Sequence, residues 1–173
     1  MELKQSLTVG VIFLIIELIL SFFIASIVKL LEPNIPIFQI LFYRYLLSLP
    51  LLVIYGFFKH GSKILQVNNV RLLLLRIICG FLGLAMWFLA VAKIDISLAT
   101  VLFNTMPLFI TILSAIIALE RVGLRRSIAV ITGFFGVIFI VLPINTSFDF
   151  WGVLYAILGA IFAGLMFVFI RML

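Results

Sequence analysis

The stretch "LLLLRIICGFLGLAMWFLAVAKIDISLATVLFNTMPLFITILSAIIAL" at residues 72–119 decides the fold of this chain. It holds two apolar runs, at about 72–92 and 97–119. Each run has the length of about 20 residues that a helix needs to cross the hydrocarbon core of a bilayer. The short polar segment Lys93-Ile94-Asp95 separates them. The stretch therefore predicts two consecutive membrane-spanning helices joined by a tight turn.

The rest of the chain has the same apolar character. Of its 173 residues, 66% are hydrophobic and 10% are charged, and the mean hydropathy is +1.46. A soluble domain of this size could not hide so much apolar surface behind so few charges. The composition therefore predicts an all-α, polytopic helical membrane protein whose surface contacts the lipid bilayer.

Four further apolar runs bring the prediction to six transmembrane helices. Prolines, charged residues and turn-forming residues separate these runs, which cover about 7–31, 37–58, 126–142 and 151–173. The first run is too long for the core of a signal peptide and lacks a small-residue cleavage site at its end. We therefore expect it to be retained as a span.

The basic residues are divided unequally between the two ends of these spans. Two of them, Lys29 and Lys93, fall on the side opposite the N-terminus, and Arg44 falls within a span. The nine on the N-terminal side are Lys4, Lys59, Lys63, Arg71, Arg76, Arg121, Arg125, Arg126 and Arg171. Because Lys and Arg are enriched in cytoplasmic loops, we expect a multi-pass protein of the cell (inner) membrane with a cytoplasmic N-terminus. The same bias accounts for the net charge of +6 without a nucleic-acid partner.

The last apolar run resembles the first one at an offset of 142 residues. The pair Gly10-Val11 falls on Gly152-Val153, and Lys29 falls on Arg171, so that a Gly-Val start and a basic end are nineteen residues apart in both. Two unrelated Leu- and Ile-rich helices would share some of these matches. If the repeat is real, its unit contains five spans, and an odd number inverts the second copy, as in many secondary transporters.

Two charged residues lie inside predicted spans, where each costs about 2.5–3.5 kcal/mol on insertion scales. Glu17 lies about ten residues into the first span, and Arg44 about seven residues into the second span from the opposite face. Their depths are close enough for the long Arg side chain to reach the Glu. Three interpretations stay open: a structural ion pair between the two helices, a proton-responsive Glu17, or charges that meet a substrate.

Polar residues form a stripe along the fourth span. Its members recur at steps of three and four residues and are Ser97, Thr100, Asn104, Pro107, Thr111 and Ser114. Pro107 removes a hydrogen bond to the carbonyl of Phe103 and predicts a bend. Back-bonding of the hydroxyls to their own helix is one explanation of the stripe. An Asn and a Pro within it favour a second explanation, a cavity wall that includes Thr100, Asn104, Pro107 and Thr111.

Other residues indicate packing or exclude some kinds of site. Ala156, Ala160 and Gly164 recur every four residues in the last span and predict a close helix crossing, and Gly80 and Gly83 are similar packing signals in the third span. Trp87 lies in mid-span, where it is either a packing residue or an aromatic cavity wall. No His, Cys or acidic residues have metal-ligand spacing, and there is no phosphate-binding Gly loop. The one histidine, His60, lies in a loop. We therefore expect no metal, no cofactor and no enzyme activity.

Several segments together resemble one protein family. They are "FYRYLLSLPLL" (42–52), "FLGLAMWFLAVAKI" (81–94), "MPLF" (106–109), "LERV" (119–122) and "GFFGVIFIV" (133–141). The set resembles the EamA domain, the repeat unit of the drug/metabolite transporter superfamily. The similarity covers residues 8–142 as one five-helix repeat and 149–173 as the first helix of a second, inverted repeat.

The resemblance implies a function and a set of site residues. It implies a ten-helix permease that moves small metabolites, amino acids, nucleotide sugars or drugs by alternating access through a central cavity. By position, Arg44 matches a basic residue of the second helix, and Glu120 matches the acidic residue that closes the fourth. Trp87, Asn104 and Pro107 fall on cavity-lining helices, whereas Glu17 matches nothing in the wider family pattern.

The chain departs from the family in length, since six helices stand where the family has ten. We expect it to be the N-terminal portion of a permease, truncated after the sixth helix. Its partners would be a small-molecule substrate, the bilayer, and a missing second half or another copy of the chain. The alternative is a truncated remnant or membrane scaffold that transports nothing.

Overall fold

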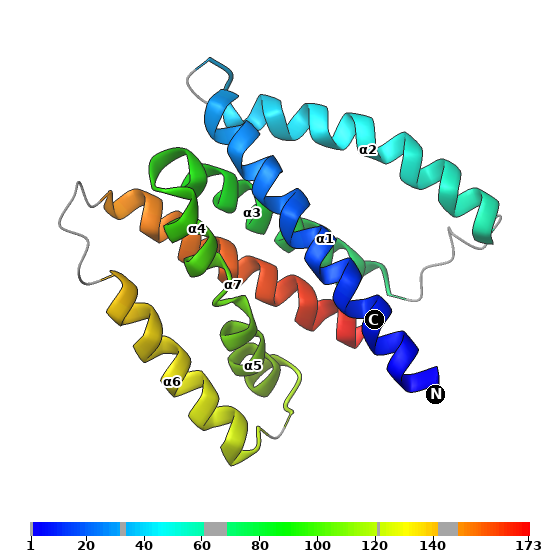
Figure 1. Cartoon of the computed structure of the whole chain (residues 1–173). Helices are drawn as coiled ribbons and strands as arrows, with labels where there is room; N and C mark the ends of the chain where they lie inside the picture. The colour runs from blue at the N-terminus through cyan, green and yellow to red at the C-terminus, as the bar shows by residue number, and fades with distance from the viewer. Residues whose placement is uncertain (1, 32–33, 61–68, 121, 142–148) are drawn as a thin grey trace.

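In the residues that it describes, the computed structural model contains seven helical segments (Figure 1). It describes residues 2–31, 34–60, 69–120, 122–141 and 149–173. In chain order the helices are α1 (Glu2–Leu31), α2 (Ile37–His60), α3 (Val70–Lys93), α4 (Ile96–Phe103), α5 (Met106–Ile117), α6 (Leu124–Val141) and α7 (Phe150–Met172). The described residues contain no strand, so the all-α prediction is confirmed.

Within the described part of the chain, five stretches are long and apolar enough to cross a membrane. They are Val9–Leu31, Ile37–Lys59, Val70–Lys93, Ile96–Ile117 and Phe150–Met172, which match five of the six predicted spans closely. The other predicted span corresponds to α6, which ends next to the residues that the structure leaves undescribed. Its crossing of the membrane stays a prediction.

The fourth span is interrupted close to the place where the sequence predicts a bend. α4 ends at Phe103 and α5 begins at Met106, so Pro107 lies in the first turn of α5, where proline is tolerated. The buried Thr105 lies in the break. Its backbone N–H and its Oγ1 both donate to the carbonyl of Leu102, at 3.1 and 2.6 Å. Thr105 therefore satisfies a carbonyl that the interrupted helix leaves behind.

The most extensive contact in the fold joins α3 and α7. Small residues make it possible: an added Cβ at Gly83 would lie 2.9 Å from the backbone nitrogen of Ala163. A Cβ at Gly159 would lie 3.2 Å from the carbonyl oxygen of Gly83. Ala156 and Ala160 are fully buried in the same contact face. The predicted close crossing of the last span is confirmed, and its partner is α3.

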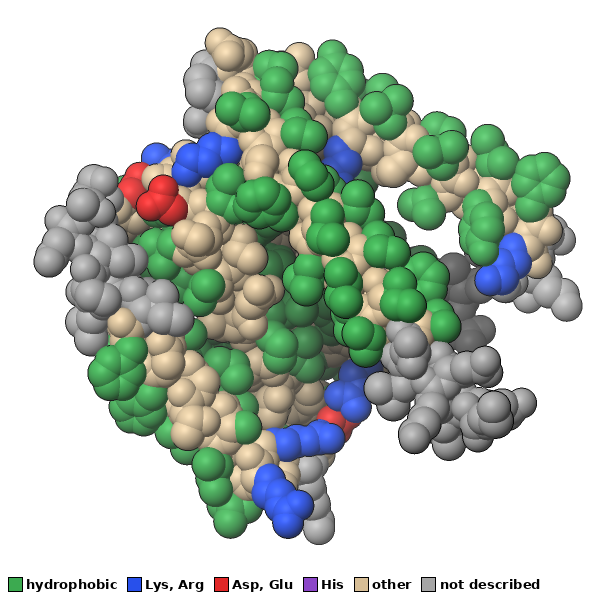
Figure 2. All heavy atoms as spheres, viewed as in Figure 1, with side chains coloured by type: hydrophobic (Ala, Val, Ile, Leu, Met, Phe, Trp, Pro, Cys, Tyr) green, Lys and Arg blue, Asp and Glu red, His purple; other side chains and the backbone are tan. Residues whose placement is uncertain are grey.

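The other helices surround this pair. Figure 1 shows α2 at one edge of the molecule and α6 at the opposite edge, with α3 and α7 between them. Within the chain, 44% of the span in α7 is buried, against 11% of the span in α1. Large apolar side chains are exposed along α1 and α2 (Figure 2). A surface of this kind suits lipid or further helices.

Polar contacts fix the relative directions of three helices. Lys93 at the end of α3 forms an ion pair with Asp149, 3.6 Å away, directly before α7. Lys29 near the end of α1 donates to the carbonyl of Ile94, just after α3, at 2.7 Å. α7 is therefore antiparallel to α3, and α1 runs parallel to α3. It follows that α1 and α7 have opposite directions.

We predict that Gly83→Ala destabilises the fold by about 1–3 kcal/mol, because the new methyl group would overlap the backbone of α7. The measurement is the thermal unfolding midpoint in detergent micelles. Gly136→Ala is the matched control, since a Cβ there has nothing within 4 Å. Equal unfolding midpoints for the two variants would contradict the role of this contact.

Candidate functional site

A pocket of about 300 Å³ lies where α1, α2, α3 and α4 meet. Its volume falls at the lower end of the range for small-molecule sites, about 300–1,000 Å³. The residues that line it are Glu17, Leu18, Ser21, Phe22, Ile24, Arg44, Leu84, Trp87, Thr100, Phe103 and Asn104. The pocket is thus mostly apolar, with one acidic, one basic and three uncharged polar side chains.

The two charged residues of the pocket are held by different neighbours. Glu17 Oε1 accepts a hydrogen bond from Ser21 Oγ, one turn further along α1, at 2.9 Å. The Arg44 guanidinium lies 5.5 Å from the ring centroid of Phe88 on α3, within reach of a cation–π interaction. Among the described residues, the ion pairs within 4.0 Å involve neither Glu17 nor Arg44. The structural ion pair between them is therefore not formed in this structure.

Trp87 forms an aromatic wall of the pocket. Its ring centroid lies 5.5 Å from that of Phe88 and 5.8 Å from that of Phe103. The side chain is only 8% exposed, and its Nε1–H has no acceptor in the part of the chain that the structure describes. Trp87 is therefore both a packing residue and an aromatic wall of the pocket, because the same ring contacts its aromatic neighbours and lines the pocket.

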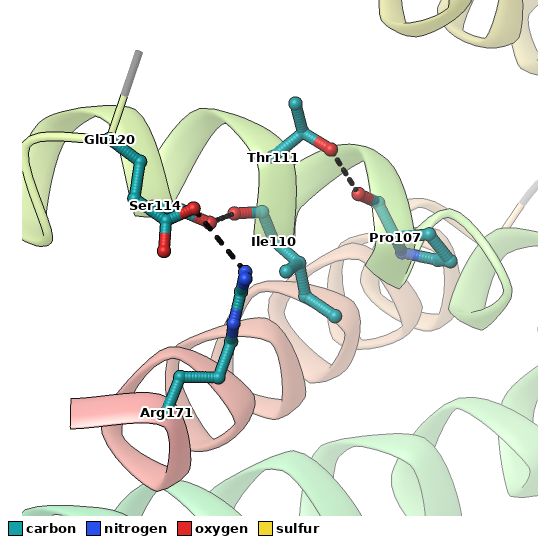
Figure 3. Close-up of polar contacts among 6 residues, drawn as sticks. All are labelled: Pro107, Ile110, Thr111, Ser114, Glu120 and Arg171. Atoms are coloured by element: carbon teal, nitrogen blue, oxygen red, sulfur yellow. Dashed lines mark hydrogen bonds and ion pairs between the residues drawn. The ribbon is translucent and has the colours of Figure 1, made fainter. Parts of the chain in front are cut away.

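The polar stripe of the fourth span is divided by the helix break. Thr100 and Asn104, one turn apart at the end of α4, line the pocket. Pro107 and Thr111 lie on α5 outside the pocket lining, and Thr111 Oγ1 donates to the carbonyl of Pro107 at 3.0 Å (Figure 3). Ser114 Oγ likewise donates to the carbonyl of Ile110. The hydroxyls of Thr111 and Ser114 thus bond to their own helix, whereas Thr100 and Asn104 line the pocket and Ser97 does not.

Five of the seven predicted site residues therefore meet in one pocket, and Pro107 and Thr111 do not. Ser21 is not among the predicted site residues, although its position four residues after Glu17 places both on one helix face. The apolar lining residues are not predicted either, because in the sequence they resemble ordinary lipid-facing positions. Glu120 lies away from the pocket and forms an ion pair with Arg171, at 3.4 Å (Figure 3). The described residues contain no group of three or more His, Cys, Asp or Glu side chains that could hold a metal ion.

The similar proteins of known function are all named as transporters. A riboflavin transporter of Brucella anthropi is 28% identical over 137 residues, which cover 77% of this chain and 46% of that protein. An S-adenosylmethionine uptake transporter of Rickettsia prowazekii is 27% identical over 156 residues, covering 88% of this chain and 51% of that protein. The pseudopaline exporter CntI of Pseudomonas aeruginosa is 28% identical over 139 residues, covering 80% and 48%.

The chain spans about half the length of these curated relatives. No solved structure matches it significantly. The model of the EamA-like transporter family matches residues 8–142, which is most of the chain. This multi-pass helical membrane protein therefore belongs to the EamA-like transporter family.

Proposed function

We propose that this chain is part of a secondary transporter for a small solute, and that the pocket between α1, α2, α3 and α4 lies on the solute's path. The observation that carries the proposal is the convergence of Glu17, Arg44, Trp87, Thr100 and Asn104 on one pocket. Four helices contribute these residues. Charged and polar side chains at membrane depth are expensive unless they serve a site or a water-filled cavity.

The known relatives support a transporter rather than an enzyme. They are named for the uptake of S-adenosylmethionine, the export of pseudopaline and the transport of riboflavin. Their solutes differ, and both uptake and export occur among them. Family membership therefore supports the transport of a small solute. It does not identify the solute, which depends on the side chains that line the pocket.

We further propose that residues 8–142 form one repeat and 149–173 the first helix of an inverted second repeat. The opposite directions of α1 and α7 support this arrangement. A complete solute path would then need further helices, supplied by a second half or by another copy of the chain. The exposed apolar surface of α1 supports such a partner, because α7, its counterpart in the repeat, is buried far more extensively.

We predict that Thr100→Val reduces solute flux at least several-fold, because it removes a hydroxyl from the pocket wall and keeps the side-chain shape. The measurement compares the small-molecule content of cells that express the wild-type chain, the variant or no chain. Thr132→Val is the matched control, since Thr132 lies on α6 outside the pocket lining and bonds to its own helix. A wild-type chain that reaches the membrane but changes no solute level would favour the scaffold alternative.

The predicted orientation in the inner membrane is tested separately by labelling single introduced cysteines. The background variant is Cys79→Ala, which removes the one cysteine of the chain. We expect Gly123→Cys, between α5 and α6, to be cytoplasmic, and Asp95→Cys, between α3 and α4, to face the opposite side. Both positions are exposed in the structure. A membrane-impermeant maleimide added to spheroplasts should label Asp95→Cys at once and Gly123→Cys only after permeabilisation. The reverse labelling pattern would contradict a cytoplasmic N-terminus.

A further inference from the structure

α6 begins with two arginines, Arg125 and Arg126, whose side chains are both exposed. The acidic residue that precedes them, Glu120, forms an ion pair with Arg171 at 3.4 Å (Figure 3). The next acidic residue in the sequence is Asp149, which lies directly before α7, at the opposite end of that helix. Among the described residues, the ion pairs within 4.0 Å involve neither Arg125 nor Arg126. The described part of the chain therefore leaves these two charges uncompensated.

The end of the molecule that is predicted to be cytoplasmic carries a large excess of positive charge. Nine basic residues are predicted on this side, and the acidic residues there are Glu2 and Glu120. The carboxylates of the chain can therefore neutralise only a minority of these cations. The cytoplasmic leaflet of a membrane presents anionic headgroups at this level, so the lipid can supply the missing negative charge.

The surface that extends from the two arginines along α6 is apolar. Its exposed residues recur at steps of three and four, so they form one helix face. They are Leu124, Ile128, Ile131, Phe135 and Ile138, and each is at least 50% exposed. Within the chain α6 packs on α5 and α4, and it lies at one edge of the molecule (Figure 1). The apolar face of α6 is therefore open to the acyl chains of a lipid.

We propose that the first turn and the apolar face of α6 bind an anionic phospholipid. Its phosphate lies at the guanidinium groups of Arg125 and Arg126, which suit phosphate oxygens because of their planar, bidentate geometry. Its acyl chains lie along the apolar face. A zwitterionic lipid brings its own cation to its phosphate and gains less from the arginines, and a soluble anion leaves the apolar face uncovered. The site lies outside the pocket and does not depend on the proposed function.

The test uses the full chain in nanodiscs that contain phosphatidylcholine and phosphatidylglycerol, one of which carries brominated acyl chains. Phe135→Trp places a fluorescent reporter on the apolar face of α6, and bromine quenches a tryptophan that it contacts. Trp151→Phe removes an exposed tryptophan, and the chain without the reporter gives the background signal of Trp87. Quenching by each lipid then gives their relative affinity for this face. We expect phosphatidylglycerol to be preferred at least about fivefold, the effect of one basic residue near an anionic membrane surface.

Variants of the reporter chain assign the preference to the two arginines. Arg125→Gln should lower it at least about twofold, and Arg125→Gln combined with Arg126→Gln should make the two lipids nearly equal. Lys59→Gln is the matched control, because it also removes one exposed positive charge on the predicted cytoplasmic side. Lys59 ends the span in α2, and α2 lies at the opposite edge of the molecule from α6 (Figure 1). We expect this variant to keep the full preference.

Equal quenching by the two brominated lipids in the reporter chain would overturn the proposal. An equal loss of preference in Arg125→Gln and Lys59→Gln would also overturn it, because the preference would then belong to the charge of the whole surface. Quenching by neither lipid would mean that protein covers this face. Displacement of brominated phosphatidylglycerol by glycerol 3-phosphate in the water would indicate a site for soluble anions. Either result would overturn the lipid site and leave the proposed transport untouched, since no readout involves flux.

Discussion

The close approach of α3 and α7 is the contact on which the rest of the structure depends. Gly159 lies at its centre, where a Cβ would meet the carbonyl oxygen of Gly83, the backbone nitrogen of Trp87 and the ring of Phe103, all at 3.2–3.3 Å. Trp87 and Phe103 are two of the aromatic walls of the pocket. Because Gly159 has no Cβ, the backbone at Trp87 and the ring of Phe103 can both lie this close to α7. A packing residue on α7 thus positions a pocket to which α7 contributes no lining side chain.

Corresponding positions of α1 and α7 in the proposed repeat carry side chains with different roles. At the offset of 142 residues, Gly159 corresponds to Glu17 and Ala163 to Ser21. In α7 these positions are small and buried against α3. In α1 they carry the carboxylate and the hydroxyl that bond to each other at the pocket. If the two helices descend from one repeat, the same helix face serves for packing in one copy and for polar chemistry in the other.

Much of the fold could be predicted because hydropathy and length report directly on membrane spans. The close crossing of α7 could be predicted because Ala156, Ala160 and Gly164 recur at the spacing of one helix face. The break before α5 could not, since Pro107 indicates only that a hydrogen bond is lost. The interruption lies at Asn104 and Thr105, and the hydroxyl and N–H of Thr105 both bond to the carbonyl of Leu102.

The sequence was sufficient to predict most of the polar and charged residues of the candidate site, but not the contacts that these residues make. Helical rise placed Glu17 and Arg44 at similar depths, and both do line one pocket. The sequence could not decide between an ion pair and separate partners, because Phe88 and Ser21 compete for these side chains. Phe88 is a residue of α3, remote in sequence from Arg44, and only the tertiary arrangement brings the two together.

The energetics of these two residues argue that they are kept for something other than stability. Each charge costs about 2.5–3.5 kcal/mol to place in a span. A hydrogen bond to a charged group contributes about 1.5–3 kcal/mol, and a cation–π contact about 0.5–2 kcal/mol. The bond from Ser21 and the ring of Phe88 together contribute about 2–5 kcal/mol, against a cost of about 5–7 kcal/mol for the two charges. Uncharged residues such as Leu or Gln would carry a smaller insertion cost at both positions. A direct ion pair would be the simplest stabilising arrangement, and the structure does not form it. The two charges therefore fit the proposed solute path better than a purely structural role.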